Sequence, residues 1–200
     1  MKVLFSDDTQ KVGEDELQED LRTLPEWRRK KVLSYRHLPD RVLCAKAFIL
    51  LREALREEYG LAEVPDFELG AFGKPQLKDH PEVHFNLSHC RSGVMCVVDD
   101  SPVGCDIECI PSAPDEDVMR AAFSEDERSR ILTSKNPPLE YASLWTKKEA
   151  FVKMTGQGIA EADLPNLLHS PAALAAEFIQ GSNPEKGYAW TISKNLHVDI

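Results

Sequence analysis

The stretch Pro102-Val103-Gly104-Cys105-Asp106-Ile107-Glu108-Cys109 follows an apolar segment and alternates like a β-strand. Because successive side chains of a strand leave opposite faces, Asp106 and Glu108 share one face and the residues between them share the other. Two carboxylates held side by side repel each other unless a positive charge offsets them. Mg²⁺ is one such charge, since proteins commonly hold it with one or two carboxylates. An ordinary solvent-exposed strand face is the alternative, and this stretch alone leaves both open.

Composition narrows the class of protein. A chain of 200 residues allows one large domain or two small lobes. The formal net charge of −10 argues against general nucleic-acid binding. No segment approaches the roughly 18 consecutive apolar residues of a membrane span, and the acidic Asp7-Asp8 comes too early for a signal peptide. We therefore expect a cytoplasmic protein that uses neither nucleic acid nor membrane as a partner.

Cysteine usage argues against zinc and against a disulfide framework. The chain has five cysteines, none spaced as a CxxC pair: Cys44, Cys90, Cys96, Cys105 and Cys109. Reduced thiols in a cytoplasmic protein fit this scatter better.

The N-terminal third reads as helical. We expect a short helix from Asp15 to Leu24, a second one opened by Pro25, and a long helix from Arg41 to Tyr59, capped by Asp40 and ended by Gly60. Arg41 then lies in an exposed first turn. The basic run from Arg28 to Lys31 is either a solvated helix face or a place for an anion.

The middle of the chain reads as strands. Gly73-Lys74-Pro75 forms a turn, and Val83 to Ser88 alternates, with His84, Asn86 and Ser88 on one face and His89 after them. Arg91-Ser92-Gly93 can close a hairpin into the apolar run 94–98. Residues 83–108 are therefore predicted to form a three-stranded antiparallel meander.

Helices return after Pro114. Ser124 and Glu127 have the spacing of a capping box, which explains Glu127 without any catalytic role. The segment from Leu139 to Thr155 is predicted to be a strong helix ended by Gly156, with Trp145, Glu149 and Lys153 on one face. Glu149 and Lys153 could form no more than a surface ion pair.

Residues 170–200 indicate their secondary structure less clearly. The segment from Ser170 to Gln180 reads as a helix or an irregular strand. Tyr188 to Ser193 and Leu196 to Ile200 read as a hairpin across Lys194-Asn195. Helices followed by antiparallel strands thus occur twice, which suggests two similar lobes.

Five motifs together resemble a known family. In order and spacing the chain resembles the 4′-phosphopantetheinyl transferases, of the longer, surfactin-synthetase-associated (Sfp-type) class, over roughly residues 25 to 160. The motifs are Gly73-Lys74-Pro75, Phe85-Asn86-Leu87-Ser88-His89, Gly104-Cys105-Asp106-Ile107-Glu108, Phe123-Ser124-Glu125-Asp126-Glu127 and Trp145-Thr146-Lys147-Lys148-Glu149-Ala150-Phe151-Val152-Lys153. Cys90-Arg91 departs from the small residues usual after the histidine.

The resemblance implies a fold and an activity. The fold would be α+β, a pseudodimer of two similar lobes, each with an antiparallel sheet packed on helices, over residues 1–101 and 102–200. The activity would be Mg²⁺-dependent transfer of the 4′-phosphopantetheine group of coenzyme A to a serine of an apo acyl or peptidyl carrier protein, releasing 3′,5′-ADP. A monomer is expected.

The resemblance also implies roles for residues. Asp106 and Glu108 would bind Mg²⁺, and Glu149 would complete that site or take the proton of the incoming serine through a water. Lys153 would neutralise the pyrophosphate and could assist the leaving group. Arg41, Lys74, Ser88 and His89, with Lys153, would contact coenzyme A.

Two other functions remain open. One is a non-catalytic module that binds a carrier protein or coenzyme A. The other is a Mg²⁺-dependent hydrolase that cleaves the pyrophosphate of coenzyme A. For a transferase, the helix around Asp117 to Phe123 is the expected docking surface for the carrier.

Overall fold

A computed structural model describes residues 1–159 and 162–195 of the chain. Its helices, 3₁₀ turns (η) and strands follow in the order β1 (Lys2–Ser6), η1 (Thr9–Lys11), α1 (Glu14–Thr23), α2 (Glu26–Leu33), α3 (Leu38–Tyr59), β2 (Phe67–Leu69), η2 (Ala71–Gly73), β3 (Pro75–Leu77), β4 (His84–Cys90), β5 (Gly93–Asp99), β6 (Val103–Cys109), α4 (Glu116–Ala122), α5 (Glu125–Thr133), α6 (Pro137–Thr155), η4 (Leu164–His169), α7 (Pro171–Leu174), β7 (Ala176–Asn183) and β8 (Tyr188–Asn195).

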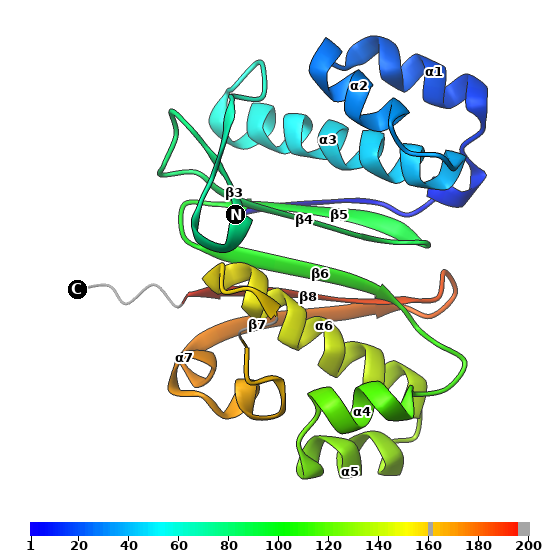
Figure 1. The fold of residues 1–200 in the computed structure, drawn as a ribbon, viewed down its shortest axis with the longest axis vertical. Helices are drawn as coiled ribbons and strands as arrows, with labels where there is room; N and C mark the ends of the chain where they lie inside the picture. The colour runs from blue at the N-terminus through cyan, green and yellow to red at the C-terminus, as the bar shows by residue number, and fades with distance from the viewer. Residues whose placement is uncertain (160–161, 196–200) are drawn as a thin grey trace.

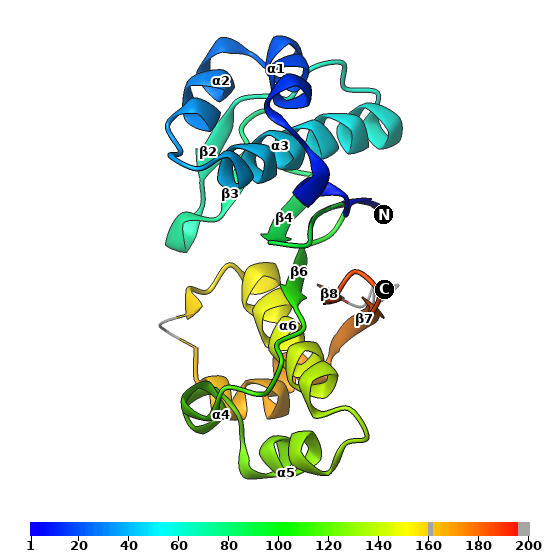
Figure 2. The same ribbon diagram turned by 90° about the vertical axis from the view of Figure 1, so that its right-hand side faces the viewer.

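Two three-stranded antiparallel sheets lie at the centre of the molecule, and a two-stranded one lies beside them (Figure 1). The first sheet has the order β1-β5-β4 and the second the order β6-β8-β7. Helix α3 packs on the first sheet and α6 on the second, on the outer side of each (Figures 1 and 2). The expected α+β class with antiparallel sheets packed on helices is confirmed.

The predicted meander over residues 83–108 is half wrong. Strands β4 and β5 do form the expected hairpin, with Ser88 opposite Met95. Strand β6, however, pairs with β8 in the other sheet, with Asp106 opposite Thr191. The physical reason is that β5 has no free edge, because β4 takes one side and the N-terminal β1 takes the other. The turn before Pro102 therefore carries the chain across to the second sheet.

The two sheets meet where β4 lies beside β6. The backbone N–H of Cys105 donates to Asn86 Oδ1 at 2.9 Å, and the N–H of Ile107 donates to Ser88 Oγ at 3.4 Å. Both contacts join residues 19 apart, so the two strands run in the same direction. Polar side chains of β4 thus take up backbone donors of β6 that would otherwise be buried without a partner.

Helix α3 begins earlier than the sequence predicts. His37 is its N-cap residue and Pro39 lies in its first turn, where a missing N–H costs nothing. Asp40 is therefore an acidic residue of the first turn rather than the cap. At the other end Gly60, at φ 69°, is the C-cap as predicted. The buried side of α3 and the face of the first sheet that it covers form one apolar cluster, which includes Leu51, Leu55 and Val98.

Helix α6 crosses β6 at backbone distance. A Cβ atom added to Gly104 would lie 2.1 Å from the carbonyl oxygen of Ala150 and 2.3 Å from the backbone nitrogen of Met154. Only glycine therefore allows this approach. Since Gly104 precedes Asp106 by two residues, the contact brings the acidic face of β6 next to the residues of α6.

The tail differs from its predicted pairing. Residues 176–183 form strand β7, so the helical interpretation of the segment from Ser170 to Gln180 holds only for the short α7. The expected turn at Lys194-Asn195 is wrong, because β8 continues through Asn195, which pairs with Ala176. The hairpin joins β7 to β8 instead. The predicted strand 196–200 lies outside the described residues.

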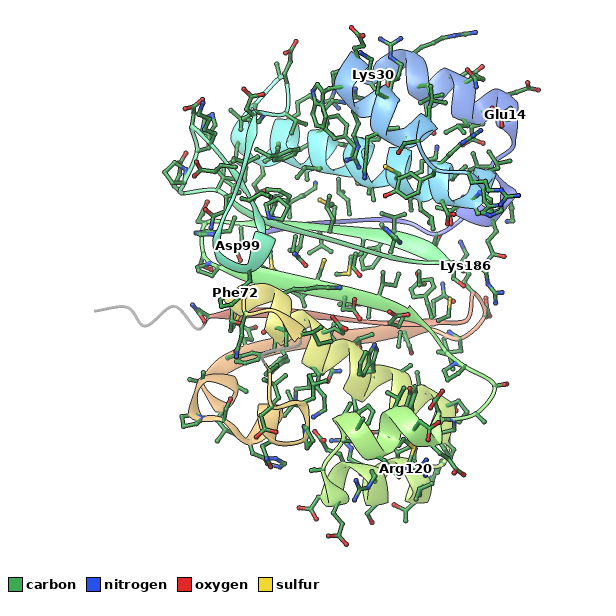
Figure 3. The ribbon with its side chains drawn as sticks, viewed as in Figure 1. Glu14, Lys30, Phe72, Asp99, Arg120 and Lys186 are labelled. Carbon is green, nitrogen blue, oxygen red and sulfur yellow. The ribbon has the colours of Figure 1, made fainter. Side chains whose placement is uncertain are left out.

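The N-terminal segment is tied to this hairpin. Lys186 Nζ, in the turn between β7 and β8, lies 2.6 Å from Asp7 Oδ1, and Tyr188 donates to Asp7 Oδ2 at 3.1 Å (Figure 3). These contacts join residues from opposite ends of the chain. Along residues 1–159 and 162–195, no helix combines the length and the apolar character that crossing a membrane requires.

Candidate active site

Three side chains meet at the joint between the sheets: Ser88 from β4, Asp106 from β6 and Lys153 from α6. Asp106 is 1% exposed, and its Oδ1 accepts from Lys153 Nζ at 2.5 Å and from Ser88 Oγ at 2.7 Å. Lys153 also donates to Ser88 Oγ at 3.1 Å. Because the three residues come from three elements, this triangle depends on the whole fold.

Two further carboxylates border the triangle. Glu149, one turn before Lys153 on α6, has its Oε2 4.0 Å from Lys153 Nζ. Glu108 lies two residues beyond Asp106 on the same face of β6. Burial and then the negative charge of Asp106 raise the pKa of Glu108 to about 7, and burial and Asp106 also raise the pKa of Glu149. Three acids therefore face one ammonium group.

Lys153 keeps its charge in this setting. Burial by itself would lower the pKa of Lys153, but the attraction of Asp106 and the hydrogen bond to it outweigh that effect, so the pKa is raised. His89 lies next on β4 after Ser88, and its pKa is lowered by desolvation and by the positive charge of Lys153, against the opposing charges of Asp40 and Asp106.

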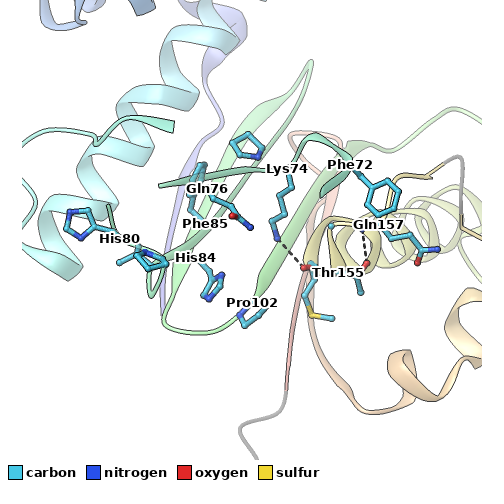
Figure 4. A pocket seen from close by; sticks show the side chains of 14 residues that line it. Phe72, Lys74, Gln76, His80, His84, Phe85, Pro102, Thr155 and Gln157 are labelled. Carbon is cyan, nitrogen blue, oxygen red and sulfur yellow. Dashed lines mark hydrogen bonds between the residues drawn. The ribbon is translucent and has the colours of Figure 1, made fainter. Parts of the chain in front are cut away.

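Lys74 holds the start of β6 to the end of α6. Its Nζ donates to the carbonyl oxygens of Val103 at 3.0 Å and Met154 at 3.2 Å. Burial lowers the pKa of Lys74 to about 8. Lys74 also lines a cleft of about 310 Å³ together with residues of β3, β4 and the end of α6, among them Gln76, His84 and Thr155 (Figure 4). Phe72, at φ 59° and largely exposed, lies at the mouth of this cleft.

The structure thus brings together most, but not all, of the residues singled out from the sequence. One cluster contains Ser88, Asp106, Glu108, Glu149 and Lys153. His89 lies close enough for the charge of Lys153 to lower its pKa. Arg41 is engaged elsewhere, because its Nε donates to the carbonyl oxygen of Tyr35 at 2.8 Å.

A second buried ion pair escaped the sequence analysis. Lys148 is 0% exposed, and its Nζ lies 2.9 Å from Glu127 Oε2 and 2.6 Å from the carbonyl oxygen of Leu164. Glu127 also accepts from the backbone N–H of Ser124, whose hydroxyl accepts from the N–H of Glu127, so the predicted capping box is confirmed. The helical spacing that groups Glu149 with Lys153 does not include Lys148, which points about a quarter of a turn away around α6.

Asn86 was noted only as one of three polar residues on its strand face. Its contact with the backbone N–H of Cys105 makes it a structural link between β4 and β6. The alternation of β4 is the signal for its orientation, but nothing in the sequence indicates that β6 is its neighbour.

Comparisons with known proteins match this chain to one family. The family model of the 4′-phosphopantetheinyl transferase superfamily matches residues 102–198. The 4′-phosphopantetheinyl transferase psf-1 of Bacillus pumilus is 41% identical over 115 residues, which cover 56% of this chain and 49% of that protein. The 4′-phosphopantetheinyl transferase Sfp of Bacillus subtilis (strain 168) is 32% identical over 136 residues, 66% of this chain and 60% of that protein.

Another relative matches over a shorter stretch. The 4′-phosphopantetheinyl transferase AcpT of Salmonella typhi is 34% identical over 101 residues, 48% of this chain and 52% of that protein. The matched stretches cover less than two thirds of the length of each of these relatives. The chain belongs to the 4′-phosphopantetheinyl transferase superfamily, to its Sfp-type class.

Proposed function

We propose that this chain transfers the 4′-phosphopantetheine group of coenzyme A to a serine hydroxyl of an apo acyl or peptidyl carrier protein, with Mg²⁺, and releases 3′,5′-ADP. The observation that carries the proposal is the cluster of Asp106, Glu108 and Glu149 around the single ammonium group of Lys153. Such an excess of negative charge beside a cleft suits a divalent cation and a phosphate-bearing substrate.

The residues fit Mg²⁺ by their chemistry. All three acids offer the hard oxygen ligands that Mg²⁺ prefers, and Asp106 Oδ2 is buried without a hydrogen-bond partner among the described residues. As the side chains lie, no three acidic, histidine or cysteine groups of the described residues are arranged to hold a metal ion together. Asp106, Glu108 and Glu149 would hold the ion once the two glutamates turn toward Asp106. When bound, Mg²⁺ would offset the charge of the pyrophosphate.

Two side chains would carry out the other parts of the transfer reaction, namely charge neutralisation and proton transfer. Transfer is an attack of a hydroxyl on a phosphoryl centre, in which positioning and charge neutralisation dominate. Lys153 would neutralise the pyrophosphate and assist the departing 3′,5′-ADP. Glu149 would help to hold the ion or take the proton of the serine through a water, and its raised pKa suits a proton acceptor.

Binding of coenzyme A would use Lys74, which lines the cleft, and two residues of β4. Ser88, His89 and Lys74 would contact its phosphates and adenosine, as the resemblance implies. Arg41 would join them only after giving up its bond to Tyr35. We propose the two halves 1–101 and 102–200 as similar lobes of a monomeric pseudodimer, since each has a three-stranded antiparallel sheet under a long helix. The surface around α4 is the proposed docking place for the carrier.

Mass spectrometry of several apo-carrier domains tests the proposal directly. Each is incubated with the protein, coenzyme A and Mg²⁺, and intact masses are recorded. The expected result is the mass of one phosphopantetheine group added to at least one carrier. Intact coenzyme A with no adduct on any carrier would favour a non-catalytic binding module. Cleaved coenzyme A with no adduct would favour a pyrophosphate hydrolase.

A further inference from the structure

Two cysteines lie opposite each other where β4 and β6 end. The hydrogen bonds between these strands join residues 19 apart in the sequence, from Asn86 to Cys105 and from Ser88 to Ile107. The same offset places Cys90, the last residue of β4, opposite Cys109, the last residue of β6. Cys90 also stands where the family resemblance leads one to expect a small residue, so the pair is a feature of this chain.

The two thiols share one apolar environment. Cys90 is a member of the apolar cluster between the two sheets, and Cys109 is partly buried against the same cluster. The Ser92 hydroxyl lies 3.6 Å from Cys109 Sγ. Both cysteines are free in this structure. A disulfide requires the two Cβ atoms to be about 3.5–4.5 Å apart, and β4 and β6 lie in contact with each other.

The two thiols differ in their access to solvent. Cys90 is 8% exposed and counts as buried, whereas Cys109 is partly exposed. An oxidant arriving from solvent therefore meets Cys109 first, with Cys90 behind it as the nearest second thiol. This is the arrangement of an oxidised cysteine with a resolving partner.

We propose that Cys90 and Cys109 are a reversible oxidation site, whose disulfide locks β4 to β6 across the joint between the two sheets. The oxidant is a peroxide, which oxidises the Cys109 sulfur to sulfenic acid and leaves as one water. The Cys90 sulfur then attacks the sulfenic sulfur, the S–O bond breaks as the S–S bond forms, and the leaving hydroxide takes the Cys90 proton as a second water. Two thiols lose two electrons in total to one peroxide, and a dithiol reductant reverses the step.

The disulfide between Cys90 and Cys109 would lie beside the candidate active site without being part of it. His89 precedes Cys90 and Glu108 precedes Cys109, so a bond between the two sulfurs constrains the backbone next to both. Elsewhere the strands β4 and β6 are held by noncovalent contacts from Asn86 and Ser88. A covalent link restricts the unfolded chain and stabilises the fold.

Peptide mapping of the unaltered chain is the primary test. The protein is reduced, freed of reductant, treated with an equimolar amount of hydrogen peroxide and digested under non-reducing conditions. We expect the intact mass to fall by about 2 Da, for the two hydrogens lost, and a linked peptide pair that contains Cys90 and Cys109. The thermal midpoint of unfolding should rise by about 5 °C, and dithiothreitol should reverse both changes.

Three variants separate this pair from the other cysteines. Cys90→Ser and Cys109→Ser should lose the linked peptide and the shift of the midpoint. Cys44→Ser, which alters a cysteine of a different apolar cluster on α3, should keep both. Peroxide treatment that yields only sulfinic acid, or a link between other cysteines, would overturn the proposal.

Discussion

Two of the three lysines of helix α6, five residues apart, are each paired with a buried carboxylate, in very different surroundings. Lys148 is wholly buried, and its partner Glu127 is fixed by the capping box with Ser124. Lys153 keeps 29% of its side chain exposed, and its partner Asp106 is flanked by Glu108 and Glu149. In both pairs one carboxylate oxygen, Glu127 Oε1 or Asp106 Oδ2, is buried without a hydrogen bond among the described residues.

The two pairs differ in the balance of their charges and in their access to solvent. At Lys148 the charges balance one to one, the pair is closed to solvent, and it joins α5 to α6 and η4. At Lys153 three acids face one cation at an open edge of the fold, so the charge is left for something else to balance. Burial and an ion pair alone therefore do not mark a functional site, and our proposal for the Asp106 cluster depends instead on its imbalance of charge.

The largest expected effect on stability comes from the closed pair. Glu127→Gln keeps a side chain that can serve the capping box but leaves the Lys148 ammonium buried without an opposite charge. Breaking such a pair costs about 3 kcal/mol of unfolding free energy. Chemical denaturation measures it. A loss below about 1 kcal/mol would show that the pair is not closed as described.

A third lysine, Lys74, has no carboxylate partner among the described residues. There it donates to two backbone carbonyls, and burial lowers its pKa to about 8 in the folded state from the ordinary 10.5. Between these values the unfolded chain binds more protons than the folded one, so the unfolding free energy should rise with pH. We expect a gain of about 1–2 kcal/mol from pH 8 to pH 10.5, reduced from the full linkage value by partial exposure.

The control for this titration is Lys74→Met, which removes the group while leaving the other lysines and tyrosines to titrate. The difference in unfolding free energy between the two proteins should change across pH 8 to pH 10.5 in the direction given. A difference that stays constant with pH would contradict a pKa of Lys74 that burial lowers in the folded state.

The smallest effect is expected at an exposed pair of the same kind. Lys30 and Glu26 on α2 lie 2.7 Å apart, and both are largely exposed (Figure 3). Such a pair contributes about 0.3–0.5 kcal/mol, so Lys30→Ala should change the unfolding free energy by no more than about 0.5 kcal/mol. A larger change, in the same denaturation experiment, would mean that exposure is a poor guide to the cost of breaking these pairs.

Local patterns were enough to predict one part of the site and not another. The alternation of β6 correctly placed Asp106 and Glu108 on one face, and the helical spacing placed Glu149 beside Lys153. The contact of Lys153 with Asp106 joins residues 47 apart, and here the family resemblance, rather than any periodicity, grouped them.

Long-range pairing was the part that local pattern could not supply. The meander was wrong because the edge of β5 is taken by β1, a strand that the sequence analysis did not identify. The pairing of β8 with β6 depends equally on which edge is free after the chain crosses between sheets. Lys148 was missed because its partner Glu127 was already explained by a local cap.

The most direct test of the account compares two matched changes, Asp106→Asn and Glu127→Gln, each of which replaces a buried carboxylate by an amide. For each, the rate of phosphopantetheine transfer per folded molecule and the unfolding free energy are measured together. We predict that Asp106→Asn lowers transfer by about 1,000-fold and changes stability by at most about 1 kcal/mol, because Lys153 retains Glu149 and solvent. Glu127→Gln should lower the unfolding free energy by about 3 kcal/mol and leave the rate of transfer per folded molecule nearly unchanged. Normal transfer by folded Asp106→Asn would contradict the assignment of the chemistry to the Asp106 cluster.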